Sequence, residues 1–183
     1  MMQKLKVLVF EYITGGGMNK SDLPESLARE GLLMLQALVN DLIWLDQVEL
    51  TVMLDVRLVG SLTHSSHDIH IIDQEQDSHQ EFTRLLQTCD AVWPIAPESE
   101  GLLQALCKEA EGSGKILLTS PANAVAIAGD KWLTYKLLQR NSIMTVQTQG
   151  LADFEYLPGE WIIKPIDGVG CADSVLIVTQ QDF

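Results

Sequence analysis

Positive charge is scarce in this sequence. The chain carries 12 lysines and arginines against 25 aspartates and glutamates, which gives a net charge of −13. Proteins that bind the phosphate backbone of DNA or RNA need a clustered cationic face, and such a face is hard to build from this balance. We therefore expect no nucleic-acid partner.

Cysteines and long apolar runs are also few. The three cysteines, at 89, 107 and 171, are far apart and lack C-x-x-C spacing, so neither a disulfide framework nor a thiolate metal site is indicated. The longest uncharged stretch, Ile116 to Gly129, falls short of the roughly 18–20 apolar residues that cross a bilayer. The N-terminus shows no apolar leader with a small-residue cleavage site. These absences predict a cytoplasmic protein without a membrane segment.

Hydrophobic residues, by contrast, make up 46% of the 183 positions, enough to bury one sizeable core or two small ones. Short β-branched and leucine-rich runs alternate with longer amphipathic runs over the first two thirds of the chain, a pattern typical of an α/β fold with a largely parallel sheet. The predicted strands are Leu5–Glu11, Val48–Leu54, Asp68–Ile72, Ala91–Ile95 and Lys115–Thr119. The predicted helices between them are Leu23–Leu45, Ser78–Thr88 and Glu98–Gly112.

The pattern of predicted helices and strands changes after Ser120. A helical period runs through Asp130–Asn141, and two strands, Trp161–Lys164 and Val175–Val178, flank a glycine-containing turn as in a hairpin. We therefore expect a first domain at residues 1–119 and a second at 120–183. The second is small for an independent domain, so we interpret it as part of a truncated one.

Lys164, at the end of a predicted strand, is followed by a loop that contains Gly168 and Gly170. Backbone N–H groups of such a loop can face an anion, and a nearby lysine adds a compact positive charge, so the pair can form a phosphate cradle. The alternative is a hairpin turn with a surface lysine. The spacing matches neither the Rossmann nor the Walker glycine motif.

The segments Asp130–Asn141, Ile143-x-x-Val146 and Trp161–Gly170 together resemble the ATP-grasp superfamily. That resemblance implies that Lys131 reaches the phosphates of ATP from a helix and that Lys164 contacts phosphate and adenine from a strand. It further implies that the loop Gly168–Ser174, with Gly170 and Ser174, closes over the β- and γ-phosphates. Cys171 and Asp173 depart from the small residues that the family pattern favours in this loop.

The resemblance extends to the first part of the chain through Phe10–Tyr12, Thr14–Gly17, Leu27–Gly31 and Ile95–Leu103. These segments are similar to the pre-ATP-grasp domain of the ligase type that joins tyramine to glutamate in methanofuran biosynthesis. The implied fold is a Rossmann-like parallel-sheet domain followed by an incomplete α+β ATP-grasp lobe.

Gly15, Gly16 and Gly17 follow the first predicted strand, at the edge where ligands enter open α/β sheets. They form a candidate substrate loop, or else a permissive turn before a helix. Glu11, at the end of the same strand, could hold a substrate ammonium or merely cap the turn. Glu98 is better explained as stabilising a helix N-terminus than as a substrate ligand.

The histidines and one cysteine are further candidates for chemistry. His64, His67, His70 and His79 fall within one polar stretch, where a solvated loop is favoured over a metal cluster. Cys171 is the most exposed thiol that we predict, but no base lies near it in sequence.

The resemblance implies an ATP-dependent ligase that forms an amide from a carboxylate and an amine through an acyl phosphate, with ATP and Mg²⁺ as cofactors. The small-molecule partners would then be ATP, the carboxylate (glutamate) and the amine (tyramine or a tyrosine-like amine). The family's magnesium ligands lie in a C-terminal lobe that this sequence lacks, so we assign no metal ligand and expect the chain alone to be inactive. A non-catalytic nucleotide-binding or small-molecule-binding module and a structural domain without a ligand remain alternatives, and a homodimer is left open.

Overall fold

The computed structural model describes residues 3–62, 68–154, 159–168 and 173–178. The chain divides into two compact units, residues 1–96 with 105–122 and residues 97–104 with 123–183. The division predicted after residue 119 stays a prediction.

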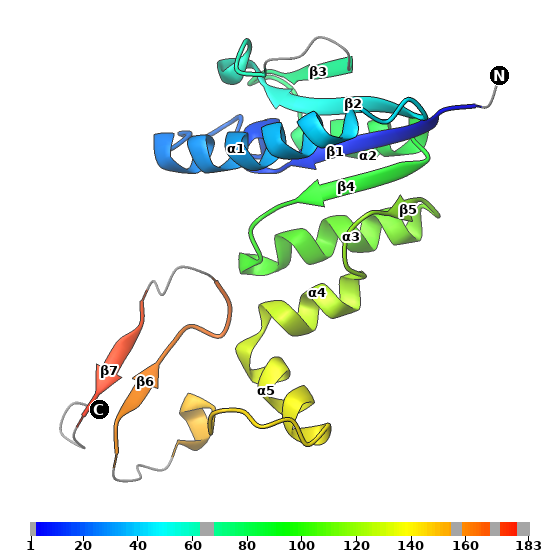
Figure 1. The fold of residues 1–183 in the computed structure, drawn as a ribbon. Coiled ribbons are helices and arrows are strands. Elements are labelled where there is room, and N and C mark those ends of the chain that lie inside the picture. Colours follow the sequence, from blue (N-terminus) through cyan, green and yellow to red (C-terminus); the bar gives the residue numbers. More distant parts are fainter. Residues whose placement is uncertain (1–2, 63–67, 155–158, 169–172, 179–183) are drawn as a thin grey trace. The chain divides into compact units, whose positions relative to one another are not determined.

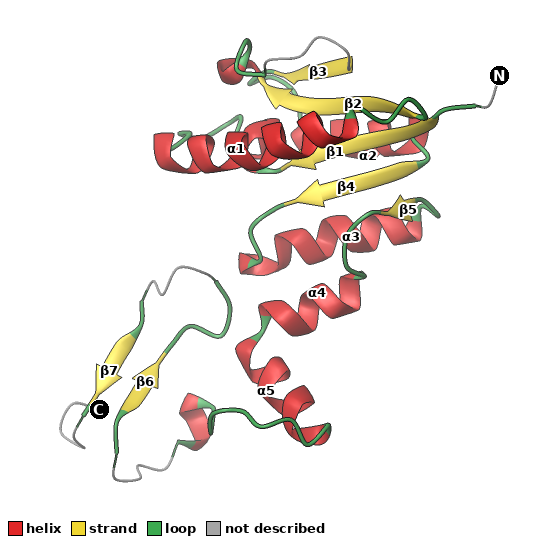
Figure 2. Ribbon diagram, viewed as in Figure 1, coloured by secondary structure: helices red, strands yellow, loops and turns green. Residues whose placement is uncertain are grey.

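The first unit is built on a five-stranded parallel sheet (Figures 1 and 2). Its strand order is β3-β2-β1-β4-β5. The strands are β1 (Leu5–Glu11), β2 (Val48–Asp55), β3 (Asp68–Ile72), β4 (Ala91–Ile95) and β5 (Ile116–Leu117). The prediction of an α/β fold with a parallel sheet is therefore confirmed, although β5 is shorter than the predicted strand Lys115–Thr119.

Both faces of this sheet are buried, because successive side chains of a strand point to opposite sides. In β1, Leu8 and Phe10 belong to one apolar cluster, whereas Val7 and Val9 belong to the other. Central strands of this kind read as continuous hydrophobic runs. That property made β1 and β2 visible in the sequence.

Helices supply the apolar side chains that cover the two faces. Helix α1 (Glu25–Leu42) contributes Leu35 and Val39 to the cluster of Val7 and Val9. Helices α2 (Ser78–Thr88) and α3 (Leu102–Gly112) contribute to the cluster on the opposite face through Phe82, Leu86, Leu106 and Ala110. Figure 1 shows α1 in front of the sheet and α2 behind it.

Helix α2 begins directly after Asp77, which is its N-cap residue. The Asp77 carboxylate accepts hydrogen bonds from the backbone N–H groups of His79 and Gln80, both at 3.0 Å. These bonds satisfy two of the N–H donors that the first turn of a helix leaves unpaired. Short 3₁₀ turns follow β2 at Val56–Leu58 and β4 at Ser99–Gly101.

The second unit contains helices, a turn and a two-stranded hairpin. Helix α5 (Lys131–Arg140) begins at Asp130, whose carboxylate accepts a hydrogen bond from Leu133 N–H at 2.8 Å. Strands β6 (Trp161–Ile163) and β7 (Val175–Ile177) pair antiparallel, as predicted, with Ile162 opposite Leu176. A 3₁₀ turn occupies Leu151–Asp153. Helix α4 (Ala122–Gly129) was not predicted, because its small apolar residues show no amphipathic period.

Candidate functional site

Lys131 contacts the segment that follows β6. Its ammonium nitrogen donates to the carbonyl oxygens of Asp167 and Gly168, at 2.9 and 3.1 Å, and its backbone N–H donates to the carbonyl of Ile166 at 2.9 Å. A lysine ammonium has three N–H donors, and these two carbonyls use two of them. The family resemblance implies that Lys131 and this glycine segment share a nucleotide site, and in the structure the two are in direct contact.

Asp167 is held from a second side. Its carboxylate oxygen Oδ2 accepts a hydrogen bond from the backbone N–H of Glu100 at 3.1 Å. Glu100 lies in the 3₁₀ turn after β4 and has a positive φ of 55°, a conformation that is uncommon for a residue other than glycine. The Asp167 side chain therefore fixes this turn, while its carbonyl receives Lys131.

Gly168 gives the segment its turn. Its φ is +81°, and a Cβ at this position would meet no atom of the described residues within 4 Å. Glycine is thus favoured here by backbone conformation rather than by packing.

Lys164 is exposed and directly follows β6. It makes no hydrogen bond or ion pair with any residue that the structure describes. Ser174, the last residue before β7, is half-buried. Gly170 and Cys171 lie outside the described residues. The structure therefore joins Lys131 to Gly168, and the nucleotide roles of Lys131, Lys164, Gly168, Gly170 and Ser174 stay predictions.

Glu11 closes the turn that follows β1. Its side chain is 1% exposed and accepts hydrogen bonds from Ile13 N–H at 3.2 Å, Thr14 N–H at 2.7 Å and the Thr14 hydroxyl at 2.6 Å. Burial raises the pKa of this carboxyl above its ordinary value, although the hydrogen bonds from Thr14 and Ile13 oppose the shift. Of the two roles considered, capping the turn is the one these contacts support. A role in holding a substrate ammonium stays a prediction.

The three glycines after Glu11 form a π-helical turn, Ile13–Gly17, that packs closely on its surroundings. A Cβ on Gly15 would lie 2.7 Å from the Phe10 ring, and one on Gly16, whose φ is +95°, would lie 2.6 Å from Ile72. A Cβ on Gly17 would lie 2.5 Å from the carbonyl of Tyr12. Real Cβ atoms essentially never approach so closely. Packing therefore accounts for the glycine run, and its use as a substrate loop stays a prediction.

A pair of charged residues that the sequence reading missed lies at the end of β2. Asp55 is fully buried, and its carboxylate accepts hydrogen bonds from Arg57 Nε at 2.8 Å and Nη2 at 2.7 Å. Burial alone would raise the pKa of Asp55, but the hydrogen bonds and positive charge of Arg57 outweigh it and lower that pKa. The sequence signal that could have revealed this pair is an Asp and an Arg two residues apart, directly after a predicted strand.

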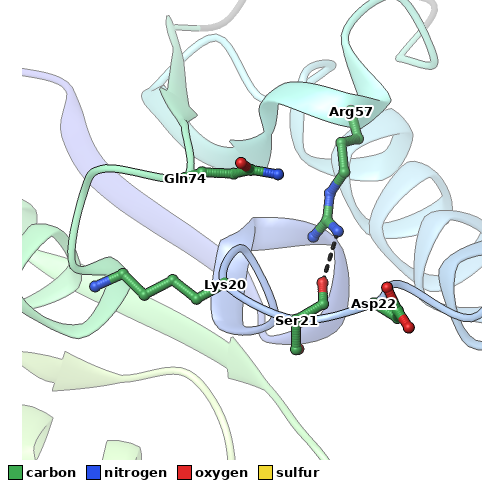
Figure 3. A pocket seen from close by; sticks show the side chains of 5 residues that line it. All are labelled: Lys20, Ser21, Asp22, Arg57 and Gln74. Atoms are coloured by element: carbon green, nitrogen blue, oxygen red, sulfur yellow. Dashed lines mark hydrogen bonds between the residues drawn. The ribbon is translucent and has the colours of Figure 1, made fainter.

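Beside this pair lies a pocket of about 400 Å³. It is lined by residues of three loops at the carboxyl edge of the sheet: Lys20, Ser21, Asp22, Arg57 and Gln74 (Figure 3). Lys20, Ser21 and Asp22 follow β1, Arg57 follows β2, and Gln74 follows β3. Open α/β sheets bind ligands at this edge.

Two of the four histidines pair with glutamates. His70 Nε2 lies 2.9 Å from a carboxylate oxygen of Glu81, and His79 Nε2 lies 2.8 Å from one of Glu109. His64 and His67 lie outside the described residues. Among the residues that are described, no group of three or more His, Cys, Asp or Glu side chains could hold a metal ion.

The described part of the chain also contains no helix with the length and apolar composition that a membrane-spanning segment needs. Cys89 and Cys107 are buried free thiols, and burial raises the pKa of each. Buried thiols of this kind are chemically inert. Neither is therefore assigned to the site.

Known proteins resemble this chain over most of its length. Residues 48–125 match the family model of the pre ATP-grasp 3 domain. The chain is 29% identical to the tyramine–L-glutamate ligase of Methanocaldococcus fervens over 168 residues, which are 90% of this chain and 53% of that protein. It is 25% identical to the ligase of the same name from Methanocaldococcus jannaschii over 166 residues, 90% of this chain and 50% of that protein. The chain thus spans about half the length of the curated relatives it matches.

Two solved structures also resemble this chain. A protein of Archaeoglobus fulgidus assigned to the ATP-grasp superfamily superposes with a TM-score of 0.69 at 28% identity, over 94% of this chain and 50% of that one. A pyruvate carboxylase variant from Rhizobium etli, at 15% identity and a TM-score of 0.58, covers 99% of this chain and 16% of its own, and shows a shared fold alone. The chain is thus similar to about half of the tyramine–L-glutamate ligases, its residues 48–125 match the pre ATP-grasp 3 domain, and its fold is similar to that of a protein assigned to the ATP-grasp superfamily.

Proposed function

We propose that the protein containing these residues is an ATP-dependent ligase that joins a carboxylate to an amine, and that the segment after β6 contributes to its phosphate site. The observation that carries the proposal is the contact of Lys131 Nζ with the carbonyl oxygens of Asp167 and Gly168. It places a cation from helix α5 against the glycine segment, as a phosphate cradle requires.

The electrostatics support this assignment. Lys131 forms no ion pair within the described residues, so no carboxylate neutralises its charge. Lys164 adds a second exposed cation only a few residues along the chain from the carbonyls that Lys131 contacts. In a protein with a net charge of −13, two such cations would offset the charge of a triphosphate locally.

The proposed reaction has two steps. A carboxylate oxygen of the first substrate attacks the γ-phosphorus of ATP, the bond to the β–γ bridging oxygen breaks, and ADP leaves with that electron pair. The amine nitrogen then attacks the acyl carbon, phosphate leaves with the C–O electron pair, and the nitrogen loses a proton to give the amide. The chain's part in the first step is to offset the negative charge of the transferring group through Lys131 and Lys164.

Phosphoryl transfer from ATP usually involves a divalent cation, which neutralises charge on the phosphates. Because the described residues offer no group of three metal-ligating side chains, we assign no residue of this chain to such a cation. The names of the relatives support L-glutamate as the carboxylate and tyramine as the amine.

A coupled assay for phosphate release tests the proposal. The whole protein encoded by the reading frame that contains these 183 residues would be incubated with ATP, L-glutamate and tyramine. We expect ADP and phosphate in a 1:1 ratio with an amide product detected by mass spectrometry, and no release when either L-glutamate or tyramine is omitted. Nucleotide binding without turnover would instead support a non-catalytic binding module.

A further inference from the structure

The two faces of the sheet in the first unit are covered unequally. On one face, both α2 and α3 contribute to the apolar cluster of Leu8 and Phe10. On the other face, α1 is the one α-helix of the described chain whose side chains join the cluster of Val7 and Val9. Figure 1 shows α1 in front of the sheet and no helix in front of β4. Two helices thus cover one face, and one helix covers the other.

The width of the sheet shows how much of this face α1 leaves uncovered. Neighbouring strands lie roughly 4.8 Å apart, so five strands span about 19 Å, whereas a helix with its side chains is about 10 Å wide. Helix α1 joins β1 to β2 and lies over that pair, as a crossover between parallel strands does. Strands β4 and β5 lie on the other side of β1. Their half of this face therefore has room for one further helix.

The side chains of β4 and β5 differ in burial between the two faces. Val92, which belongs to the cluster of α2 and α3, is fully buried. Trp93 and Leu118 belong to the cluster of α1 and are only half-buried. Because side chains alternate along a strand, Ile95 and Ile116 lie on this second face as well. Ile95 is half-buried and Ile116 is 54% exposed.

Helix α1 carries apolar side chains on the flank beside this half of the sheet. Leu27, Met34 and Leu38 are spaced by seven and four residues, so they share one flank of the helix. Leu27 and Met34 are each 42% exposed, and Leu38 is half-buried. Because α1 is right-handed and belongs to a right-handed crossover, this flank points toward β4 rather than toward β3. The β4–β5 surface is defined by these apolar side chains: Leu27, Met34, Trp93, Ile95 and Ile116.

The charged side chains that adjoin the apolar flank of α1 are acidic. Glu30 and Asp41 lie four and seven residues from Met34, the spacings at which side chains of a helix are neighbours. Both are exposed, and neither forms an ion pair within the described residues. Their negative charge is therefore available to a ligand on the β4–β5 surface.

The nearest cations of α1 and β5 point elsewhere. Arg29 lies five residues before Met34, which places it about 140° away around the helix axis. Lys115, directly before β5, donates from its ammonium group to the carbonyls of Gln87 and Cys89 at the end of α2, at 3.1 and 2.8 Å. It thus points to the opposite face of the sheet. A basic ligand would meet the two carboxylates without competition from either cation.

We propose that the β4–β5 surface binds an amphipathic helix of a partner polypeptide, with its apolar side on β4 and β5 and lysines or arginines toward Glu30 and Asp41. Helices that lie on apolar surfaces in this way are a recurring mode of recognition. A second copy of this chain fits less well. A two-fold interface brings the same patch of both copies together, which would set these carboxylates against each other in a chain with a net charge of −13. The proposal does not depend on the proposed ligase activity.

Fluorescence anisotropy with a labelled model peptide tests the proposal on the whole protein. The probe is a peptide of about 18 leucines and lysines, with the leucines at three- and four-residue intervals so that it forms a basic amphipathic helix. One control peptide has the same composition in an order without that period, and the other has glutamate in place of lysine. We expect saturable 1:1 binding of the probe and binding at least about tenfold weaker for both controls. Absence of binding, or equal binding of the control without the period, would overturn the proposal.

Single substitutions locate the binding on the β4–β5 surface. Met34→Ser and Ile116→Ser should each weaken binding of the probe about fivefold, because each removes apolar area that the helix buries. The matched control is Leu33→Ser. Leu33 is 63% exposed on the same helix, but it is turned by about 100° from Met34, so this variant should bind like the wild type. Thermal melts would verify that all three variants are folded. Unchanged affinity in both surface variants would reject the location.

Two further measurements exclude other occupants of the surface. Sedimentation velocity gives the oligomeric state of the whole protein, and we expect the wild type and Met34→Ser to sediment alike. A dimer that Met34→Ser dissociates would show that a second copy covers the surface. The probe is also titrated into the 183-residue chain. If that chain binds the probe and the whole protein does not, the rest of the protein covers the surface. Either result would overturn the proposal of a separate partner.

Discussion

The ammonium nitrogen of Lys131 lies 2.9 Å from the carbonyl oxygen of Asp167. The hydrogen-bond acceptors that hold Lys131 beside the glycine segment are neutral carbonyls. Because they carry no negative charge, they do not neutralise the positive charge of the ammonium group. An anionic phosphate oxygen adds Coulomb attraction to the charge-assisted hydrogen bond that a neutral carbonyl can also accept, so it can compete for the donors of Lys131. Lys131 can therefore order the segment without a ligand and remain available for the nucleotide contact that we propose.

Replacing either proposed phosphate lysine should weaken nucleotide binding in the whole protein. A charge-assisted contact contributes about 1.5–3 kcal/mol, so Lys131→Ala and Lys164→Ala should each lower the affinity for ATP on the order of 10- to 100-fold. Titration with a fluorescent ATP analogue measures this effect, and thermal melts check that the variants are folded.

Lys136 provides the matched control on the same helix. Five residues turn an α-helix by about 500°, roughly 140° beyond a full turn, so Lys136 and Lys131 lie on different faces. In the structure, Lys136 Nζ lies 5.0 Å from the centre of the Trp132 ring. Lys136→Ala should leave nucleotide affinity unchanged, and equal affinities for the wild type and both site variants would contradict the phosphate assignment.

Asp167→Ala should loosen the turn at Glu100. The substitution removes the acceptor of the 3.1 Å hydrogen bond from Glu100 N–H, which contributes about 1 kcal/mol to local stability. Amide exchange at Glu100 should become about fivefold faster, as measured by nuclear magnetic resonance. Glu160→Ala, at an exposed position of the same unit, should leave that rate unchanged, and an unaltered rate in the Asp167 variant would show that the turn is fixed by other contacts.

The sequence was most informative where one physical signal dominated. Strands β1 and β4 were predicted with their observed ends because continuous apolar runs mark strands that are buried on both faces. The bounds of α2 were predicted as well, because Ser78–Thr88 is one of the amphipathic runs between the predicted strands. Helix α4 gave no such signal, since its small apolar residues have no polar face.

The polar contacts of the candidate sites depend on positions far apart in the chain. Arg57 binds the carbonyls of Ser21 and Met18, which precede it by 36 and 39 residues. Asp167 accepts a hydrogen bond from a residue 67 positions earlier. No local pattern encodes such pairs, so the pocket and its anchoring arginine could not be predicted. The proposed role of Lys131 likewise came from a family resemblance and not from a local pattern, and it stays a prediction.

The buried Asp55 should stabilise the fold in a pH-dependent way. Burial acts to raise its pKa, but the hydrogen bonds and charge of Arg57 prevail and hold the folded pKa below the ordinary value of 3.8. The stabilisation is therefore present above pH 3.8 and is lost as the pH falls through the folded pKa. Asp55→Asn should be less stable than the wild type at pH 7 by about 2 kcal/mol, and the gap should narrow in acid. Urea melts at several pH values would measure it, and a gap independent of pH would contradict the assignment.

Glu11 should show the opposite pH dependence. Burial raises its pKa above the ordinary value of 4.5, against the hydrogen bonds from Thr14 and Ile13. The folded state thus binds this proton more tightly than the unfolded state, so the contribution of Glu11 is full below pH 4.5 and is lost as the pH rises through the folded pKa. Glu11→Gln cannot ionise. The stability of the wild type relative to this variant should therefore fall with rising pH in urea melts, and a rising difference would mean that the hydrogen bonds outweigh burial.

Gly31 should resist a substitution that normally stabilises helices. Alanine in the middle of a helix is about 1 kcal/mol more favourable than glycine. A Cβ on Gly31 would, however, lie 2.5 Å from Glu11 Oε2 and 3.0 Å from Thr14 Cγ2. The Glu11 carboxylate is held by three hydrogen bonds and cannot rotate away without losing them. Gly31→Ala should therefore destabilise the protein by about 2 kcal/mol. Gly112→Ala, at the end of α3 with no atom within 4 Å of a Cβ, is the matched control and should leave stability equal or slightly higher. If both variants melted like the wild type, the Glu11 carboxylate would have to move freely, and its hydrogen bonds could not be what orders the turn after β1.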